Sequence, residues 1–268
     1  MRLAIRHTTS YAYDGPVPYG LQQIRLTPKS GQGQTVHHWE TVIEGGRVEV
    51  SFIDQNRNLV QLATFDEGTR EMRVHSRGEV EVAETNGIVG AHGGFMPLWL
   101  FERSTPLTRA GQQCRQIVAS VRDEADELTR LHRLSHEIGA RIEWLPGISN
   151  VAWTAEEALA EGRGVCQDHA HAFIACARAL GHPARYVSGY LLMEDQPKQD
   201  ATHAWAEAHI GGLGWVGFDV SNGICPDERY VRAATGLDYA EAAPIHGTRY
   251  GAAEERLAVS VEVEQVQQ

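Results

Sequence analysis

The chain has 268 residues, a length that suits one large domain or two modest ones. Its net charge of −11 at pH 7 argues against nucleic acid as a partner, because phosphate binding requires a basic stripe and the lysines and arginines form none. The charge gives equally little support for an anionic membrane surface, and no run of about 18 apolar residues could span a bilayer. Hydrophobic residues at 42% and charged residues at 22% are typical of a globular protein in solution.

The N-terminus and the cysteines predict a cytoplasmic protein. Residues 1–9 alternate like a strand and lack the apolar block of a signal peptide. The cysteines show no C-x-x-C pairing and no dense framework, so we expect free thiols in a reducing compartment. Of these, Cys176 and Cys225 are expected to pack as small hydrophobic residues. The four cysteines are Cys114, Cys166, Cys176 and Cys225.

Residues 1–90 predict a set of short antiparallel strands. The first strand has Leu3, Ile5 and Tyr11 on one face and is expected to end at the turn Asp14-Gly-Pro-Val-Pro. Short strands at regular spacing favour an antiparallel sandwich or barrel. The further strands are expected at 24–26, 39–43, 48–53, 59–64, 72–75 and 79–82.

A glycine-rich segment at 85–94 predicts the boundary between an N-terminal antiparallel β domain, residues 1–90, and a second domain, residues 91–268. In the second domain, apolar periodicity predicts three helices, the last an amphipathic helix with one buried stripe. The helices are expected at 110–121, at about 126–139 and from 166 to 180, and later strands at 184–192, 202–210, 215–219 and 257–263.

Cys166 lies where a glycine-punctuated loop, Gly162-Arg-Gly-Val-Cys-Gln-Asp-His, becomes the third of these helices. The first turn of a helix presents unpaired N–H groups and the positive end of the helix dipole, and both favour thiolate over thiol. Downstream lie His203, in a predicted strand, and Asp219, at the end of Trp215-Val-Gly-Phe-Asp. In chain order these residues are typical of a nucleophile, a base and an orienting acid.

The hairpin that carries the base and the acid makes a testable demand on register. If Ile210 pairs with Gly214 around a three-residue turn, Trp205 faces Asp219. His203 then lies diagonal to Asp219 on the same face, roughly 7–8 Å away by Cα. A slip of one residue would place the two side chains on opposite faces. We therefore expect this register, or a bulge that has the same effect.

These three residues predict covalent catalysis on an acyl group. Cys166 would attack an acyl carbon and form a thioester, while His203 would pair with the thiolate and then protonate the leaving amine. Asp219 would fix the imidazole tautomer and stabilise its cation.

The oxygen that becomes negative during such an attack requires hydrogen-bond donors. The backbone N–H of Cys166 at the helix start is the first expected donor, and the second is left open among Gln167, Trp144 and Trp153. Asp168 lies in the first helical turn, where a carboxylate complements the dipole, and is a further candidate for tuning the site.

Structural explanations compete with this interpretation, because a cysteine in a helix or a histidine on a strand is more often structural than catalytic. Metal binding is weaker still: His132 and His136 are spaced for it, but the order His-Arg-Leu-Ser-His-Glu is not His-Glu-x-x-His, and we expect a solvated helix face. A Cys166–His169 metal pair would lack further ligands. No glycine-rich phosphate motif opens a helix after a strand, so no cofactor is expected.

These motifs resemble the bacterial transglutaminase-like superfamily, whose members are often described as cysteine proteases. The family's catalytic cysteine, histidine and aspartate fall on Cys166, His203 and Asp219. The resemblance covers nearly the whole chain and implies an α+β fold: a papain-like core, with the cysteine helix packed on an antiparallel sheet, preceded by an all-β domain. It is carried by Gly164-Val-Cys-Gln-Asp, Pro183-Ala-Arg-Tyr-Val-Ser-Gly-Tyr, His203-Ala-Trp-Ala-Glu and Gly214-Trp-Val-Gly-Phe-Asp.

The chain departs from the family pattern at three places. Asp219-Val-Ser-Asn replaces Asp-Pro-Thr-Asn, His169 stands where Phe or Tyr is common, and Gly236-Leu-Asp-Tyr lacks the arginine of Gly-Arg-Asp-Tyr. These changes leave the three catalytic candidates in place, so they bear on specificity rather than on chemistry.

The sequence therefore predicts a cofactor-free, thiol-dependent amide hydrolase or acyl transferase acting on a peptide or protein amide. Hydrolysis is favoured because no acceptor-lysine site can be identified, although an amine acceptor stays open. The alternative is a non-catalytic protein- or peptide-binding module that keeps the fold. A metal-dependent hydrolase has no coherent ligand set behind it.

Overall fold

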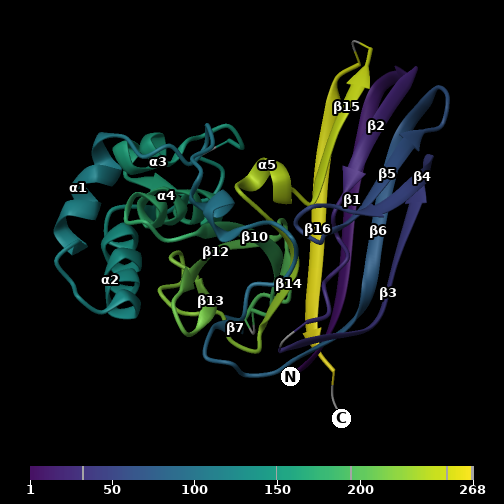
Figure 1. Cartoon of the computed structure of the whole chain (residues 1–268). Coiled ribbons are helices and arrows are strands. Elements are labelled where there is room, and N and C mark those ends of the chain that lie inside the picture. The colour runs from purple at the N-terminus through teal and green to yellow at the C-terminus, as the bar shows by residue number, and fades with distance from the viewer. Residues whose placement is uncertain (32, 149, 194, 252, 267–268) are drawn as a thin grey trace.

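The structure is a computed structural model that describes residues 1–31, 33–148, 150–193, 195–251 and 253–266. Three antiparallel sheets dominate it. Figure 1 shows one of these sheets, called sheet C, lying between a group of helices on one side and the other two, called sheets A and B, on the other. None of the helices described is long and apolar enough to cross a membrane.

Sheets A and B form the predicted all-β part. Sheet A has the order β11-β16-β1-β6-β3 and sheet B the order β15-β2-β5-β4. Apolar side chains of both sheets, such as Tyr13, Met72 and Phe65, form one core cluster, as a sandwich requires. The strands of sheet A are β1 (Arg2–Val17), β3 (Gln34–Glu44), β6 (Thr69–Val82), β11 (Lys198–Gln199) and β16 (Glu255–Gln265). Those of sheet B are β2 (Tyr19–Ile24), β4 (Gly46–Ile53), β5 (Leu59–Phe65) and β15 (Ile245–Tyr250).

Three local expectations in this part are wrong. The turn at Asp14 is absent, because β1 continues to Val17 with a register irregularity after Ala12, the kind of place where a strand tolerates proline. The strand expected at 24–26 lies earlier, as β2. The two strands expected at 72–75 and 79–82 are one continuous strand, β6, which pairs along β1 on one side and β3 on the other.

Strand pairing crosses the boundary predicted near residue 90 in both directions. The short strand β7 (Ile88–Gly90) joins sheet C, whereas β15 and β16 return to sheets B and A. The register of β16 against β1 runs from Leu3 opposite Gln265 to Tyr13 opposite Glu255. Sheet membership therefore does not follow the division into residues 1–90 and 91–268, and that division stays a prediction about folding units.

Sheet C has the order β14-β10-β12-β13-β7 and packs one face on a central helix, α4. The sequence predicted β10, β12 and β13 but missed β14, together with α3 and several short elements. The strands are β10 (Ala184–Leu191), β12 (His203–Ile210), β13 (Gly214–Phe218) and β14 (Tyr230–Gly236). The helices are η1 (Leu98–Glu102), α1 (Gln112–Val121), α2 (Glu127–Gly139), α3 (Ala155–Glu161), α4 (Cys166–Ala179) and α5 (Tyr239–Ala242), and β8 (Glu143–Trp144) pairs in parallel with β9 (Arg163–Gly164).

Helix α4 is buried all round, not along one stripe as expected. Every residue from 168 to 178 is buried. Small alanines on several faces let the sheet and the helices α1, α2 and α3 approach it closely. The buried Arg178 is satisfied by backbone carbonyls, with donors 2.7–2.8 Å from oxygens of Phe101, Ala184 and Leu237. This burial fixes the position of the helix that begins at Cys166.

The other face of sheet C packs on sheet A. Leu3 and Val80 of sheet A share an apolar cluster with Tyr190 and Val231 of sheet C. Beside it lies the fully buried Glu207, whose carboxylate is 2.6 Å from Arg185 Nη2 and 2.8 Å from Arg232 Nε. A buried carboxylate is stable only when paired in this way.

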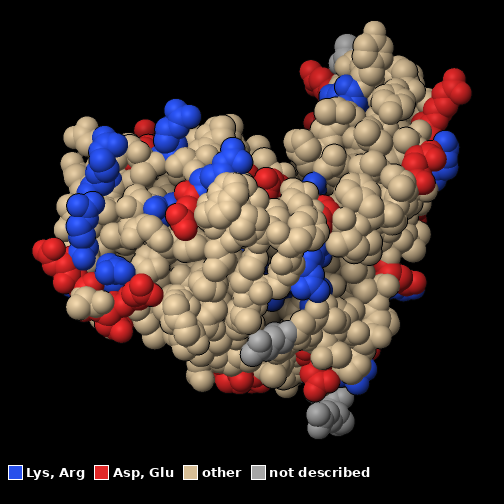
Figure 2. Space-filling model, viewed as in Figure 1, with Lys and Arg blue, Asp and Glu red and all other residues tan. Residues whose placement is uncertain are grey.

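On the face shown in Figure 2, basic side chains along the helical side lie next to acidic ones, and much of the surface is uncharged. Among the ion pairs of the helical part, Arg133 and Glu124 lie 3.5 Å apart.

Candidate active site

Cys166 is the first residue of α4, and the turn before it is closed by Asp168. The Asp168 carboxylate accepts the Val165 N–H at 2.8 Å. Gly164 leaves room for that carboxylate, because a Cβ there would lie 2.7 Å from Asp168 Cβ. The Cys166 side chain is half-buried, so the sequence folds a reachable thiol onto the positive end of a buried helix.

His203 and Asp219 meet through the hairpin register that the sequence predicts. Ile210 pairs with Gly214, and the ladder continues to Ala206 opposite Phe218. Asp219 follows the end of β13, and its Oδ2 lies 2.6 Å from His203 Nε2. Both side chains are buried. The predicted register is confirmed.

The Asp219 carboxylate receives several further hydrogen bonds. Ser221 Oγ donates to Oδ1 at 2.6 Å, Asn222 Nδ2 to Oδ2 at 2.7 Å, and Tyr230 OH to Oδ2 at 2.8 Å. Burial by itself raises the pKa of Asp219, but the hydrogen bond and charge of His203, with the bonds from Ser221 and Asn222, hold it well below its usual range. Asp219 is therefore an ionised acceptor, and His203 Nε2 carries the hydrogen between them.

Asp219 occupies His203 Nε2, and Cys166 lies close enough to the ring for its side chain to raise the pKa of His203. Burial lowers the pKa of His203, but the charge of Cys166 and the hydrogen bonds from both neighbours outweigh it and raise the pKa to about 10. The raised pKa of His203 and the lowered pKa of Asp219 thus favour an imidazolium beside a carboxylate.

Aromatic rings enclose His203. Trp205 stacks on it with ring centres 6.2 Å apart and an interplanar angle of 28°, and Tyr230 packs at 5.8 Å. Trp205 and Tyr230 also contact each other edge-on at 5.4 Å. Sequence reasoning missed Tyr230, although the strand-forming residues Tyr230, Val231 and Thr235 could have revealed its strand. It also missed Tyr186, whose pKa is raised well above its usual value, first by burial and then by the charge of Cys166.

Comparison with known proteins agrees with this architecture. Residues 112–220 match the model of the transglutaminase-like superfamily, and residues 3–81 match the bacterial transglutaminase-like N-terminal region. The chain belongs to the transglutaminase-like superfamily. The resemblance inferred from its motifs and the predicted α+β fold are therefore confirmed.

Several relatives extend over the whole chain. An uncharacterized protein of Mycobacterium leprae is 27% identical over 98% of both chains, and one of Mycobacterium tuberculosis is 28% identical over 98% of this chain and 92% of its own. A crystal structure from Cytophaga hutchinsonii, described as a candidate cysteine protease, superposes with a TM-score of 0.79 at 21% identity, covering 100% of this chain and 92% of that one. That likeness shows a shared fold.

The candidate oxyanion donors of this transglutaminase-like core differ in position. Gln167 is half-buried and its amide donates to the Val151 carbonyl at 3.4 Å, a long hydrogen bond. Trp144 pairs with Gly164 across β8 and β9, and 54% of it is exposed. Trp153 is half-buried against the core around α4. Their role as donors stays a prediction.

The three other histidines considered as metal ligands lie either on an exposed helix face or against backbone carbonyls. His132 and His136 are exposed on α2, as expected for a solvated face. His169 is buried, with its ring nitrogens 2.9 Å from the carbonyl oxygens of Val165 and Ile142. Across the described part of the chain, no group of three or more His, Cys, Asp or Glu is arranged to hold a metal ion.

The four cysteines are free thiols, and Cys176 is fully buried as expected.

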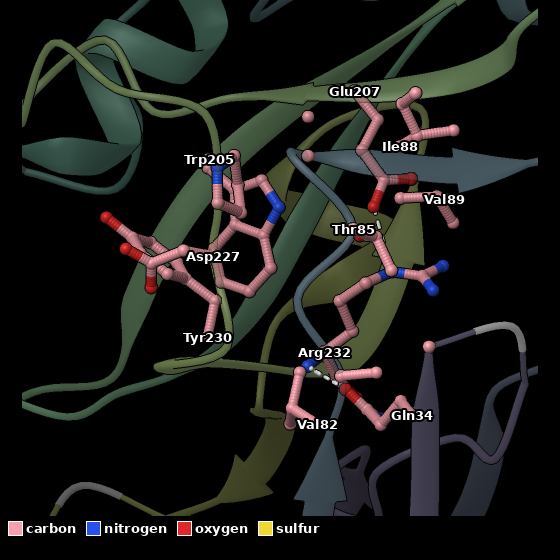
Figure 3. Close-up of a pocket in the computed structure, with 15 residues that line it drawn as sticks. Gln34, Val82, Thr85, Ile88, Val89, Trp205, Glu207, Asp227, Tyr230 and Arg232 are labelled. Carbon is pink, nitrogen blue, oxygen red and sulfur yellow. Dashed lines mark hydrogen bonds and ion pairs between the residues drawn. The ribbon is translucent and has the colours of Figure 1, made fainter. Parts of the chain in front are cut away.

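A small pocket touches the two rings that enclose His203. Figure 3 shows Trp205 and Tyr230 on one side of it and Glu207 and Arg232 on the other. The remaining lining comes from the ends of β3 and β6, from β7 and the segment before it, and from the segment before β14. It includes Gln34, Val82, Thr85, Ile88 and Asp227.

Proposed function

We propose that this transglutaminase-like protein is a thiol-dependent amide hydrolase or acyl transferase in which Cys166 is the nucleophile, His203 the base and Asp219 the orienting acid. One observation carries the proposal: the buried His203–Asp219 pair, 2.6 Å apart, converges with a cysteine at the start of a helix. Such an arrangement of nucleophile, base and orienting group is the general pattern of covalent acyl transfer.

In the proposed reaction the thiolate sulfur of Cys166 attacks the carbonyl carbon, and the electron pair of the C=O bond moves to oxygen. When the tetrahedral intermediate collapses, the C–N bond breaks and the proton on His203 Nδ1 passes to the leaving amine, so that a thioester remains. Water or an amine then attacks the thioester, gives its proton to His203, and the C–S bond breaks to restore the thiolate. Asp219 stays ionised throughout and stabilises the imidazolium.

The position of Cys166 supports its attack on a peptide or protein amide. Its backbone N–H, at the start of α4, is the donor we assign to the developing oxyanion. Cys166 and Gln167 are both half-exposed, so water can reach the thioester, and we favour hydrolysis over amine transfer. The free thiols suit a reducing compartment, and we propose the cytoplasm.

A non-catalytic binding module is the alternative. In such a module we would expect the thiol, imidazole or carboxylate to be lost or separated. Here the His203–Asp219 pair has the hydrogen-bond geometry of a working base and orienting acid.

The test is the pH dependence of Cys166 alkylation by iodoacetamide, read by peptide mass spectrometry. Cys225 serves as a control thiol in the same molecule, because it is also half-exposed and burial raises its pKa. We expect Cys166 to react at far lower pH than Cys225, and His203→Ala to remove that advantage. An identical profile for Cys166 in the wild type and in His203→Ala would refute the proposal. Loss of labelling with a chelator would instead point to a metal.

A further inference from the structure

Tyr230 contacts Asp219 from an edge strand of sheet C that does not pair with β13. Its strand, β14, is separated from β13 by β10 and β12 in the sheet order. The side chain is buried, and its hydroxyl donates to Asp219 Oδ2 at 2.8 Å. The same ring packs on His203 and Trp205. One residue thus joins the carboxylate, the imidazole and the opposite edge of the sheet.

The hydrogen bonds to Asp219 differ in what they can fix. Ser221 and Asn222 belong to the turn that directly follows Asp219, so they move with it. Of the donors that the described residues supply to this carboxylate, His203 and Tyr230 come from other strands. Since His203 is the group to be held, Tyr230 is the donor that fixes the Asp219 carboxylate relative to a different strand.

The acceptor capacity of the carboxylate is fully used. Oδ2 receives His203 Nε2, Asn222 Nδ2 and Tyr230 OH, and Oδ1 receives the Ser221 hydroxyl and the Asn222 N–H. A carboxylate offers about four lone-pair positions, so these donors leave it little freedom to rotate. Burial, and then the charge of Asp219, raise the pKa of Tyr230, which keeps its hydroxyl a protonated donor.

We propose that Tyr230 is a positioning residue for the proposed acyl-transfer site. It holds Asp219 Oδ2 against His203 Nε2 and, with Trp205, fixes the imidazole plane so that Nδ1 faces Cys166. The inference rests on the proposed function for its kinetic consequence, whereas the hydrogen-bond geometry that it concerns can be measured without any substrate.

The experiment compares Tyr230→Phe with Tyr190→Phe. Both changes remove one hydroxyl from a buried tyrosine of sheet C and keep the ring. The Tyr190 hydroxyl, however, contacts His7 and the Leu26 carbonyl, in the contact region between sheets A and C. Tyr190→Phe therefore reports the general effect of losing a buried hydroxyl.

Two measurements are made on each variant. The first is the rate of Cys166 alkylation by iodoacetamide at neutral pH, which we expect to fall about tenfold in Tyr230→Phe and to stay unchanged in Tyr190→Phe. The second is the NMR signal of the His203 Nε2 proton, which we expect to shift or broaden only in Tyr230→Phe. Ser221→Ala, which removes a donor from the Asp219 turn itself, should have a smaller effect on both.

An unchanged His203 proton signal in Tyr230→Phe, or equal effects of the two tyrosine variants, would overturn the inference. If the wild type shows no elevated Cys166 reactivity, the proposed function fails. The NMR comparison then still decides whether Tyr230 positions the His203–Asp219 pair. The two failures are thus distinguishable.

Discussion

His203 holds the charge on which the proposed chemistry depends. Its pKa of about 10 lies above the ordinary value of 6.5, because the charges and hydrogen bonds of Cys166 and Asp219 outweigh the burial that lowers it. A raised pKa means that the folded protein binds this proton more tightly than the unfolded chain does. The resulting stabilisation is complete below about pH 6.5 and is lost as the pH rises towards 10.

Replacing Asp219 with asparagine should therefore narrow the alkaline range of activity. The variant keeps the size of the side chain but removes its charge, so the pKa of His203 falls and the imidazolium is lost at lower pH. We expect the alkaline limb of amide cleavage to move to lower pH by at least about one unit.

A p-nitrophenyl ester provides the control for that prediction, because its leaving group needs no proton. Its alkaline limb should shift less than that of the amide. Equal alkaline limbs for Asp219→Asn and the wild type on the amide would contradict the assigned role of Asp219.

At the scale of single elements, the start of α4 depends on glycine. A methyl group at residue 164 would lie 2.8 Å from Asp168 Oδ2, so Gly164→Ala must displace the carboxylate that accepts the Val165 N–H. We expect this variant to lose both stability and Cys166 reactivity, measured by urea unfolding and by alkylation.

Gly162→Ala is the matched control. Gly162 has a φ of 69°, which costs a non-glycine residue roughly 1 kcal/mol, yet a Cβ there meets only the Arg141 carbonyl at 3.5 Å. It should lower stability by about that amount and leave the Cys166 alkylation rate unchanged. If both variants lose reactivity alike, the Asp168 contact is not what positions the thiol.

Helix α1 has its start capped from another helix. Glu156 of α3 accepts the backbone N–H groups of Gly111, Gln113 and Cys114 at 2.7–2.9 Å. Burial raises the pKa of Glu156, but the hydrogen bonds from Cys114 and its neighbours outweigh it and lower the pKa below 4.5. The stabilisation is therefore present above about pH 4.5 and is lost as the pH falls further.

We expect Glu156→Gln to lower the free energy of unfolding by about 1–2 kcal/mol at pH 7. The difference from the wild type should shrink as the pH falls below about 4. Glu161→Gln, at an exposed ion pair with Arg163, should change stability by less than ~0.5 kcal/mol. A pH-independent effect of Glu156→Gln would show that the capping charge is not responsible.

Short sequence patterns predicted the features that depend on neighbouring residues, such as helix caps and the hairpin register. Asp126 caps α2 by accepting the Thr129 N–H, as its position before a periodic helix indicates, and the hairpin register followed from its glycine turn. Cys166 and His203 were found because short motifs place them. Tyr230 was missed because its importance depends on pairing across two strands, and α4 was misread because alanine gives no signal of burial on every face.

At the scale of the molecule, buried charges within sheet C lie beside the apolar packing between sheets A and C. Glu207 pairs with Arg185 and Arg232, and Lys29 donates to Asn56 and Thr235 nearby. Burial, and then the charges of Arg232 and Arg185, lower the pKa of Lys29 well below its usual value. Arg185 and Arg232 thus share the Glu207 carboxylate, whereas Lys29 is also influenced by the charge of Asp54.

Glu207→Gln should be strongly destabilising, by roughly 3–5 kcal/mol, because it removes the buried counter-charge of two largely buried arginines. The check is the free energy of unfolding from urea titration. Glu79→Gln removes the partner of Arg2 in an ion pair nearer the surface and should cost less than ~1 kcal/mol. Similar losses for the two variants would mean that the buried Glu207 ion pairs contribute little to the stability of sheet C.

The proposed reaction requires a covalent intermediate on Cys166. It is tested most directly by mixing the protein with p-nitrophenyl acetate, quenching with acid and locating the acetyl group by mass spectrometry. We expect one acetyl group on Cys166 in the wild type, little in His203→Ala, and none at that site in Cys166→Ser under the same conditions. Acetylation spread over Cys225 and surface lysines, or equally strong at Cys166 in His203→Ala, would contradict it.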